Sequence, residues 1–365
     1  MGSESRISWN MLGPRLVNML TSLASFVSAI FLPLFADEFG ASKFEIGLIG
    51  ASYGVAYFFS AWIMGRQSDI RGRLPFVRIG LGTGAIALVL QSMASSSLTL
   101  MLVRALAGLC FGMVSLAIMA YNYEEGQSTG GFASLGALGW LTGTFIAIFV
   151  HDYRVLFFLS SASTSLAFAV SLFLKERERH AFIMPDVMRV VRRNVRVYLP
   201  FFLRHFGANM IWIIFPLFMV SLGANKSWIA ILLSINTAGQ FITMMFVERF
   251  RESRLFHAGF ILTTLVFIAY ALSTNYLQLI PVQALLAVAW SCFYVGALLL
   301  LLRKNEEKAT AIGIFFSIMS LAEATGPFFG GLVAELLGYS ALMYVAACFS
   351  IIGLAVAVAP GRAKR

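Results

Sequence analysis

Residues 33–43 read Pro-Leu-Phe-Ala-Asp-Glu-Phe-Gly-Ala-Ser-Lys, and residues 216–226, which lie 183 positions later, read Pro-Leu-Phe-Met-Val-Ser-Leu-Gly-Ala-Asn-Lys. Six of these eleven positions are identical. The register then continues without a gap over a second, charged pattern: Arg66, Asp69 and Arg71 align with Arg249, Glu252 and Arg254. A repeat of this length indicates a chain built from two similar halves.

The composition places this duplicated chain in a membrane. Hydrophobic residues make up 59% of it and charged residues 12%, with a mean hydropathy of +0.83, whereas soluble domains carry about 25% charged residues. A membrane-spanning helix needs roughly 20 apolar residues. Such stretches lie at about 14–36, 44–65, 76–94, 98–121, 130–150, 154–174, 197–222, 227–247, 257–273, 277–302, 309–334 and 338–359. We therefore predict an all-α membrane protein with 12 transmembrane helices in two pseudo-symmetric six-helix bundles.

The distribution of basic residues predicts the orientation. With the N-terminus in the cytoplasm, 22 of the 27 Lys and Arg residues fall in cytoplasmic segments, and only Lys43, Arg154 and Lys226 fall in outside loops. Cytoplasmic loops of membrane proteins carry the excess of Lys and Arg. We expect a multi-pass protein of the cell (plasma) membrane with both termini in the cytoplasm. The same asymmetry accounts for the net charge of +10 without nucleic acid as a partner.

Six spans separate the two copies of the repeat, so both copies enter the membrane from the same side and the repeats are parallel. We divide the chain into an N-terminal six-helix bundle (residues 1–174), a cytoplasmic linker (175–196) and a C-terminal six-helix bundle (197–365). Four arginines of the linker recur at helical spacing beside valines: Arg189, Arg192, Arg193 and Arg196. They predict a basic amphipathic helix on anionic membrane lipids. The alternative is a basic loop that only follows the charge asymmetry.

Cysteine usage and motifs give no support to an enzyme or a metalloprotein. Cys110, Cys292 and Cys348 all fall inside apolar spans, so neither a disulfide framework nor a metal site is expected. No Gly-Lys-Ser or Gly-Lys-Thr phosphate-binding motif occurs, and we expect no cofactor. No nucleophile, base and oxyanion donor can be assembled from motifs, which argues against catalysis.

Three motifs resemble those of a known family. Residues 65–73 read Gly-Arg-Gln-Ser-Asp-Ile-Arg-Gly-Arg, residues 104–108 read Arg-Ala-Leu-Ala-Gly, and residues 326–331 read Gly-Pro-Phe-Phe-Gly-Gly. They are similar to the G-x-L-[SA]-D-R-x-G-R, R-x-x-Q-G and G-P-x-x-G-G elements of the major facilitator superfamily (MFS). Gln67, Ile70 and Ala107 depart from these patterns. The resemblance covers the whole chain and implies a transporter with the MFS fold.

The resemblance also implies a cytoplasmic gating motif that latches the two halves together while the cavity opens outward. Its residues here are Gly65, Asp69, Arg71, Gly72 and Arg73. The glycines allow a tight turn between two helices, and Asp69 is placed to accept hydrogen bonds. The alternative is a turn with positive charge and no gating role. Glycines in spans five and eleven predict close helix packing: Gly136, Gly139, Gly143, Gly326, Gly330 and Gly331.

Four ionisable residues lie inside the spans, where a charge costs about 3 kcal/mol or more: Arg104, Arg204, His205 and Glu323. Glu323 is the only acid near the membrane middle, and desolvation would favour its protonated form, as a proton carrier requires. We predict transport or coupling roles for Glu323, Arg104 and His205. The alternatives are a structural glutamate and a histidine that is only hydrogen bonded. We expect Arg204 to extend to the inner interface, about two turns away.

Polar and aromatic side chains at helical spacing predict a substrate cavity. In the family, spans one, four, seven and ten line the path. The candidates on spans one, seven, eight and ten are Asn18, Ser22, Ser25, Asn209, Trp212, Asn236, Gln240, Gln283, Trp290 and Tyr294. The alternative for each is interhelical hydrogen bonding or ordinary packing.

These features predict a secondary active transporter that moves a small organic solute by alternating access (rocker-switch). Proton-coupled efflux of a drug-like or metabolite substrate by an antiporter is favoured. With three basic groups and one acid in the spans, an anionic or neutral solute fits better than a dication. The alternatives are a facilitator or symporter that imports a sugar or organic anion, and a non-transporting membrane receptor or scaffold. We expect a monomer, with the substrate, protons and anionic membrane lipids as partners.

Overall fold

The computed structural model describes residues 9–359 except 128, 177–186, 248 and 306. Within these residues the regular structure is helical throughout. The first half forms α1 (Trp9–Val27), α2 (Leu32–Asp37), α3 (Lys43–Arg71), α4 (Arg73–Ser92), α5 (Ser97–Glu124), α6 (Thr129–Phe149) and α7 (Tyr153–Leu172). The second half forms α8 (Val187–Trp212), α9 (Phe215–Ser221), α10 (Lys226–Val247), α11 (Glu252–Leu272), the 3₁₀ turn η1 (Tyr276–Gln278), α12 (Leu279–Lys304) and α13 (Lys308–Val358).

The first span of each half is broken where the repeated segment begins. Pro33 stands in the first turn of α2 and Pro216 in the first turn of α9, where a proline costs no backbone hydrogen bond. The axis bends by 52° between α8 and α9. The two prolines therefore start a short second helix at the same place in each copy of the repeat.

The short helices also end in the same way. Gly40 after α2 and Gly223 after α9 have φ of 74° and 90°, a left-handed conformation that favours glycine. The N–H groups of Ala41 and Ala224 then donate to the carbonyl oxygen five residues earlier, at 3.2 and 3.0 Å. This bond closes the end of a helix after a left-handed glycine. The identical positions of the repeat are thus the ones that fix a sharp corner.

The last identical residue of the repeat is a lysine that begins the next helix, Lys43 in α3 and Lys226 in α10. The Nζ of Lys226 lies 3.6 Å from the ring centroid of Tyr153 and donates to the carbonyl oxygen of His151 at 3.1 Å. The Nζ of Lys43 lies 4.7 Å from the ring centroid of Tyr339. Both copies therefore place the ammonium group over a tyrosine.

The chain divides into two compact units. The first contains Met1–Ala41, Ser52–His180 and Lys226–Ile231, and the second contains Ser42–Ala51, Ala181–Asn225 and Leu232–Arg365. The beginning of α3 therefore belongs to the second unit and the beginning of α10 to the first. The domain limits at residues 174 and 197 remain a prediction from the sequence.

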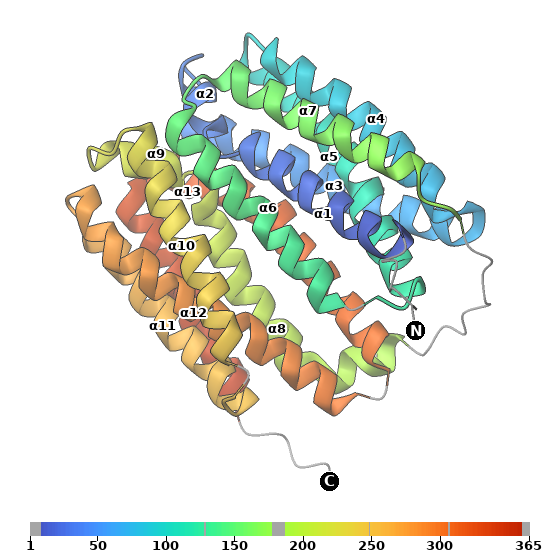
Figure 1. The fold of residues 1–365 in the computed structure, drawn as a ribbon. Helices are drawn as coiled ribbons and strands as arrows, with labels where there is room; N and C mark the ends of the chain where they lie inside the picture. Colours follow the sequence, from blue (N-terminus) through green and yellow to red (C-terminus); the bar gives the residue numbers. More distant parts are fainter. Residues whose placement is uncertain (1–8, 128, 177–186, 248, 306, 360–365) are drawn as a thin grey trace, which may run out of the picture. The chain divides into compact units, whose positions relative to one another are not determined.

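In the first unit, α1 packs against α6 and α7, and α4 packs against α5 and α7 (Figure 1). Glycines bring α6 close to α1, because a Cβ at Gly139 would collide with the carbonyl oxygen of Met19, and one at Gly143 would lie 3.1 Å from Val27. The glycines of span five therefore serve helix packing. A core that includes Val17 fills the space between α1, α4, α5 and α7.

In the second unit, α8 packs along α13, and α11 packs against α12 and α13. Phenylalanine rings fill the contact: Phe201 of α8 stacks on Phe293 of α12 at 4.5 Å and lies 4.3 Å from Phe315 of α13. Gly330 of α13 lies directly against the backbone of Met210 on α8. The glycines of span eleven therefore allow the close approach that their spacing predicted.

Helix α8 begins ten residues before the span predicted at 197–222, so the basic segment at 187–196 is its first part and not a separate helix. Val190 is buried in the core of the second unit, while the four arginines are exposed. Asn194 and Asn305 exchange side-chain hydrogen bonds of 2.8 and 3.1 Å. Arg193 donates to Glu307, and this hydrogen bond lowers the pKa of the Glu307 carboxyl. The role of anionic lipids at this segment remains a prediction.

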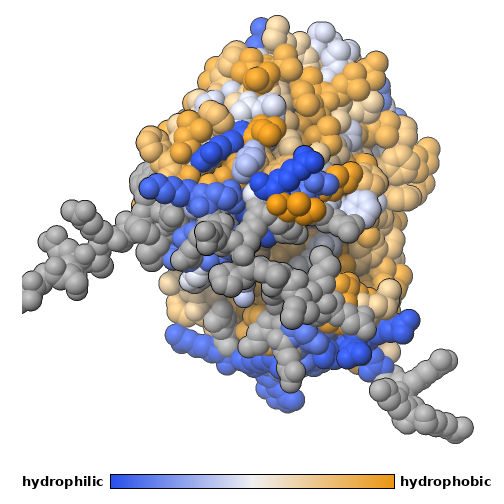
Figure 2. Space-filling model, turned by 90° about the vertical axis from the view of Figure 1, so that its right-hand side faces the viewer, coloured by the Kyte–Doolittle hydropathy of each residue, from blue (hydrophilic) through white to orange (hydrophobic). Residues whose placement is uncertain are grey.

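Nine helices of the described residues are long and apolar enough to cross a membrane, or ten with the bent α8–α9 pair. Helix α13 is 51 residues long, and Gly338, with φ 81° and ψ 178°, breaks it where the last two predicted spans meet. In α6 the apolar segment Ser134–Phe149 is shorter. These helices form a multi-pass membrane protein and are consistent with twelve spans. Hydrophobic side chains cover much of the coloured surface in Figure 2, as lipid contact requires.

Replacing Gly330 by alanine should lower the melting temperature (Tm) of the purified protein in differential scanning fluorimetry. The new Cβ would lie 2.7 Å from the Cα of Met210, and overpacking of this kind costs about 1–3 kcal/mol. Gly313→Ala on the same helix is the matched control, because its Cβ would meet no atom within 4 Å and alanine favours a helix. Its Tm should stay the same or rise. Equal losses for both variants would contradict this packing.

A double-mutant cycle of Lys226→Ala and Tyr153→Leu should reveal a coupling of about 0.5–1 kcal/mol in the free energy of unfolding, because the ammonium lies over the ring. Unfolding in mixed detergent micelles measures it. Lys226→Arg keeps a cation, so its free energy of unfolding should lie closer to that of the wild type than the value for Lys226→Ala does. Strict additivity of the two single changes would show that the contact contributes nothing.

Candidate functional site

Glu323 and His205 meet in the second unit. Glu323 lies on α13 midway between its start and its break at Gly338, and its Oε1 is 3.5 Å from the Nε2 of His205 on α8. This distance is long for a hydrogen bond but close enough for attraction between a carboxylate and an imidazolium. The side chain of His205 is 7% exposed, and that of Glu323 is 48% exposed. The structure thus brings together two of the three predicted coupling residues and leaves the carboxylate accessible.

Two aromatic residues of α12 extend this pair. The ring of Trp290 lies 5.3 Å from that of His205, with 27° between the planes, and 5.3 Å from that of Tyr294, with 22° between the planes. Trp290 and Tyr294 are partly exposed. We call His205, Trp290, Tyr294 and Glu323 the aromatic–carboxylate site.

Arg204 does not extend to the inner interface, and this prediction is wrong. Its side chain is buried at 2% exposure, and its Nε and one terminal nitrogen donate to Thr263 Oγ1 at 3.1 and 2.9 Å. The guanidinium carbon lies 4.8 Å from the ring centroid of Phe293 and 5.2 Å from that of Trp290. Because ring faces attract a cation and Thr263 accepts two hydrogen bonds, the charge is tolerated inside the bundle.

Arg104 belongs to the first unit and is also buried, at 6% exposure. Its guanidinium carbon lies 4.2 Å from the ring centroid of Tyr53, and one terminal nitrogen is 3.5 Å from Gln91 Oε1. Its Nε has no hydrogen-bond partner in the described part of the chain. Arg104 is therefore held inside its bundle by groups of α3 and α4, and its coupling role remains a prediction.

Asn209 and Trp212 continue the face of α8 that carries His205. The side-chain nitrogen of Asn209 donates to the carbonyl oxygen of His205 at 2.9 Å, and a Cβ at Gly326 would lie 2.6 Å from its Cβ. The ring of Trp212 lies 5.5 Å from that of Phe215. Asn209 is thus engaged at the contact between α8 and α13, one turn from the histidine.

The predicted polar residues of α10 and α12 form a connected network. Gln240 donates to Asn236 Oδ1 at 2.6 Å, and Asn236 donates to the carbonyl oxygen of Gln283 at 3.3 Å. Ser291 reaches the carbonyl oxygen of Gln240 at 3.4 Å. The amide group of Gln283 itself is buried, and neither of its polar atoms has a hydrogen-bond partner among the described residues. The side chain of Asn236 thus bonds across to α12 and that of Gln240 bonds within α10, and a cavity role for these residues remains a prediction.

The three candidates on span one lie in the first unit. Asn18 donates to the carbonyl oxygen of Phe132 at 2.8 Å, and a Cβ at Gly136 would lie 2.8 Å from Asn18 and 3.3 Å from Ser22. Both side chains therefore lie at the contact between α1 and α6. Ser25 is partly exposed. The first two have a packing role in this structure, and a cavity role for all three remains a prediction.

The gating motif lies at the junction of α3 and α4. Arg73 donates to Glu124 Oε1 at 2.8 Å and to Ser68 Oγ at 2.9 Å, all within the first unit. Gly72 precedes α4, and Glu176 accepts the backbone N–H of Arg73 at 2.8 Å. Arg71 is exposed, while the burial of Gly65 and the side chain of Asp69 lie outside the described part of the structure. The contacts of Arg73 thus stabilise one bundle, and a latch between the halves remains a prediction.

The sequence analysis missed the groups that hold the buried charges. Thr263 accepts the hydrogen bonds of Arg204, while Tyr53 and Gln91 contact Arg104. Gln91 carried a signal, because an amide inside an apolar span needs a partner. Thr263 carried none, because a threonine in a membrane helix can bond its own backbone.

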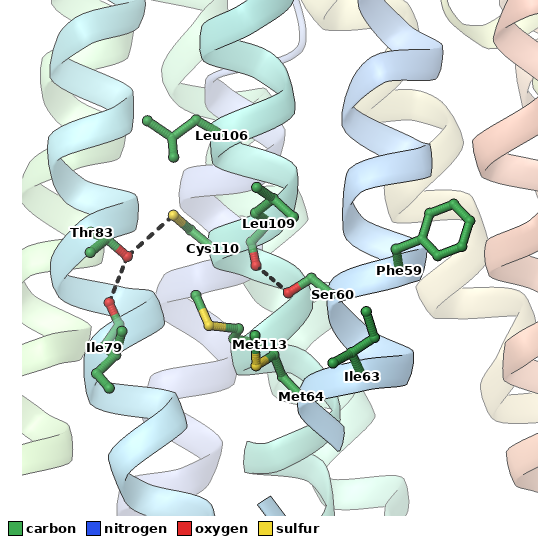
Figure 3. Close-up of a pocket in the computed structure, with 10 residues that line it drawn as sticks. All are labelled: Phe59, Ser60, Ile63, Met64, Ile79, Thr83, Leu106, Leu109, Cys110 and Met113. Atoms are coloured by element: carbon green, nitrogen blue, oxygen red, sulfur yellow. Dashed lines mark hydrogen bonds between the residues drawn. The ribbon is translucent and has the colours of Figure 1, made fainter. Parts of the chain in front are cut away.

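A separate apolar crevice of about 320 Å³ lies between α3, α4 and α5 in the first unit (Figure 3). Apolar side chains such as Phe59, Ile63 and Leu106 line most of it, and none of the predicted site residues does. The thiol of Cys110 donates a hydrogen bond to Thr83 Oγ1 there, at 3.2 Å. The described residues contain no group of three His, Cys, Asp or Glu side chains that could hold a metal.

Two bacterial multidrug resistance proteins are similar to the chain in sequence. The multidrug resistance protein MdtG of Escherichia fergusonii is 24% identical over 392 aligned residues, which cover 95% of this chain and 93% of that protein. MdtG of Proteus mirabilis is 31% identical over 159 residues, which cover 39% of each chain.

Two solved structures share the fold. A bacterial homologue of the human lysosomal transporter Spinster, in an inward-facing and occupied conformation, matches with a TM-score of 0.79 at 15% identity, covering 98% of this chain and 97% of the other. The nucleoside transporter NupG matches with a TM-score of 0.75 at 15% identity, covering 96% and 97%. At these identities the matches show the fold alone, and they confirm the predicted all-α fold. A family model described as Major Facilitator Superfamily matches residues 16–195 and 197–364, so the chain belongs to this superfamily of membrane transporters.

Proposed function

We propose that this transporter exports a small organic solute in exchange for protons, by opening a central site alternately to the two sides of the membrane. The observation that carries the proposal is the carboxyl group of Glu323, which lies within a membrane-spanning helix beside a titratable imidazole and stays 48% exposed. Ionisable groups at such depth are costly and are kept where they handle ions or substrates. The multidrug resistance relatives support export of an organic compound. The cytoplasmic placement of both termini belongs to the same proposal.

Two protonation states of the site differ in charge by one unit. An ionised Glu323 needs a nearby positive group, which the charge of a bound solute supplies when His205, 3.5 Å away, is neutral. A protonated Glu323 needs no counter-charge. A solute that binds one of these states better than the other is therefore bound and released as the proton moves, which couples the two fluxes.

Glu323→Gln removes the titratable group and keeps the shape of the side chain. We expect proton-driven transport of ethidium or norfloxacin in proteoliposomes to fall at least about tenfold, while exchange at equal pH on both sides continues. Asp37→Asn, at an exposed carboxylate after the start of the repeat, is the matched control and should behave like the wild type.

Three other outcomes of this experiment would count against the proposal. Unchanged proton dependence in Glu323→Gln would remove this residue from coupling. Downhill flux without proton dependence in the wild type would favour a facilitator. If no probe crosses the membrane, the receptor or scaffold alternative gains support.

His205→Asn keeps a hydrogen-bonding side chain that cannot be protonated. The rate of proton-driven transport should fall about tenfold or more, and its pH profile should lose one ionisation, because the carboxylate loses its titratable partner. His257→Asn on α11 is the control, since His257 lies beside Phe256 and not at the site. A His205→Asn profile that matches the wild type at every pH would reduce His205 to a packing residue.

A further inference from the structure

We propose that the aromatic–carboxylate site binds a planar aromatic compound that carries one positive charge, with the ring system against Trp290 and Tyr294 and the charge beside Glu323. This inference rests on the proposed transport function and names the class of solute for the same site. It differs from the expectation drawn from the sequence, where three basic groups and one acid favoured an anionic or neutral solute.

Burial decides which charge a solute meets. The guanidinium of Arg204 is covered, because its side chain is 2% exposed and two of its nitrogens are bound to Thr263. Its charge also lies against the rings of Phe293 and Trp290. Glu323 in contrast keeps 48% of its side chain exposed. An approaching solute in the second unit therefore meets a carboxylate and not a guanidinium.

His205 does not change the negative charge that a solute meets at this site. Its side chain is 7% exposed, and its Nδ1 is buried without a hydrogen-bond partner in the described part of the chain. An imidazolium has two N–H donors, and leaving one of them buried and unpaired is costly. The neutral imidazole, whose second nitrogen needs no donor partner, fits this environment better. The charge that the site presents is then that of Glu323.

The aromatic side chains of the site favour an aromatic solute. Trp290 and Tyr294 stand one turn apart on α12 and are stacked, with their ring planes 22° apart, and His205 continues the stack at 27°. Trp290 and Tyr294 are both partly exposed, so an aromatic solute can pack in an offset or edge-to-face arrangement against the open part of this stack. Aromatic faces also attract cations, most strongly at tryptophan. A carboxylate in the same site thus matches a ring system with a positive charge at its edge.

The test compares three solutes that share one three-ring plane: N-methylacridinium (a cation), acridone (neutral) and acridine-9-carboxylate (an anion). Binding to the full-length protein is measured by isothermal titration calorimetry in nanodiscs of zwitterionic lipid, which removes attraction of the cation to the membrane. We expect the cation to bind at least about tenfold more tightly than the other two. Tighter binding of the anion or the neutral compound, or no binding of any of the three, would overturn the inference.

Variants separate the two parts of the site. Glu323→Gln should abolish the preference for the cation, while Glu323→Asp, which keeps the charge, and Asp37→Asn should retain it. Trp290→Leu should weaken binding of the cation and of the neutral compound to the same extent. Trp290→Phe, which keeps an aromatic ring, should weaken their binding less. Size-exclusion profiles and Tm values establish that each variant is folded. A cation preference that survives Glu323→Gln in folded protein would also overturn the inference.

Flux measurements distinguish this inference from the proposed function. Binding of N-methylacridinium that depends on Glu323, without flux of any solute in proteoliposomes, would support the solute class and contradict transport. Proton-driven flux of other solutes without a preference for the cation would support transport and contradict the solute class.

Discussion

The cost of placing charge inside an apolar bundle is the constraint on which the interior of this transporter depends. Each of its ionisable groups is accommodated by neighbours within its own unit. Arg204 is surrounded by Thr263 and aromatic rings, and Arg104 by Tyr53 and Gln91. Such neighbours compensate a cation without a carboxylate, because hydroxyl oxygens and ring faces both carry partial negative charge. Neither arginine therefore needs Glu323 as a counter-ion.

The duplication repeats the scaffold but not the chemistry. The proline, the left-handed glycine and the lysine of the repeat occur twice with the same local geometry. The ionisable residues of the spans have no such counterpart: Arg104, Arg204, His205 and Glu323 align at the same spacing with Ala287, Thr21, Ser22 and Trp140. The residues that shape the backbone at the repeated corner thus occur in both halves. Each ionisable residue of the spans occurs in one half only. Two similar bundles can in this way have unequal roles.

Sequence reasoning succeeded where a residue type constrains the backbone directly. The glycines of spans five and eleven were predicted to allow close helix packing, and apolar stretches of about 20 residues located the spans. The pairing of His205 with Glu323 was within reach, because few groups of this kind occur in the spans. The break of α13 at Gly338 also lay where two stretches were separated.

The orientation of side chains around each helix was beyond the sequence. An apolar helix gives no sign of which face meets lipid and which meets another helix, because both surroundings are apolar. Arg204 was for this reason assigned to the interface, although α8 turns it toward α11 and α12. The contact of Asn18 with α6 was beyond the sequence for the same reason, and its cavity role remains a prediction.

The accessible charge of the site, and not the number of charged residues, decides what it can attract. A count of charged residues gives Arg204 and Glu323 the same importance. The electrostatic interaction of a charged side chain with a solute is strong mainly when the two come close together. Arg204 is enclosed on all sides by its bundle, whereas Glu323 is half exposed beside two partly exposed rings. The same enclosure that stabilises the arginine therefore hides it, and the single acid determines the sign of the site.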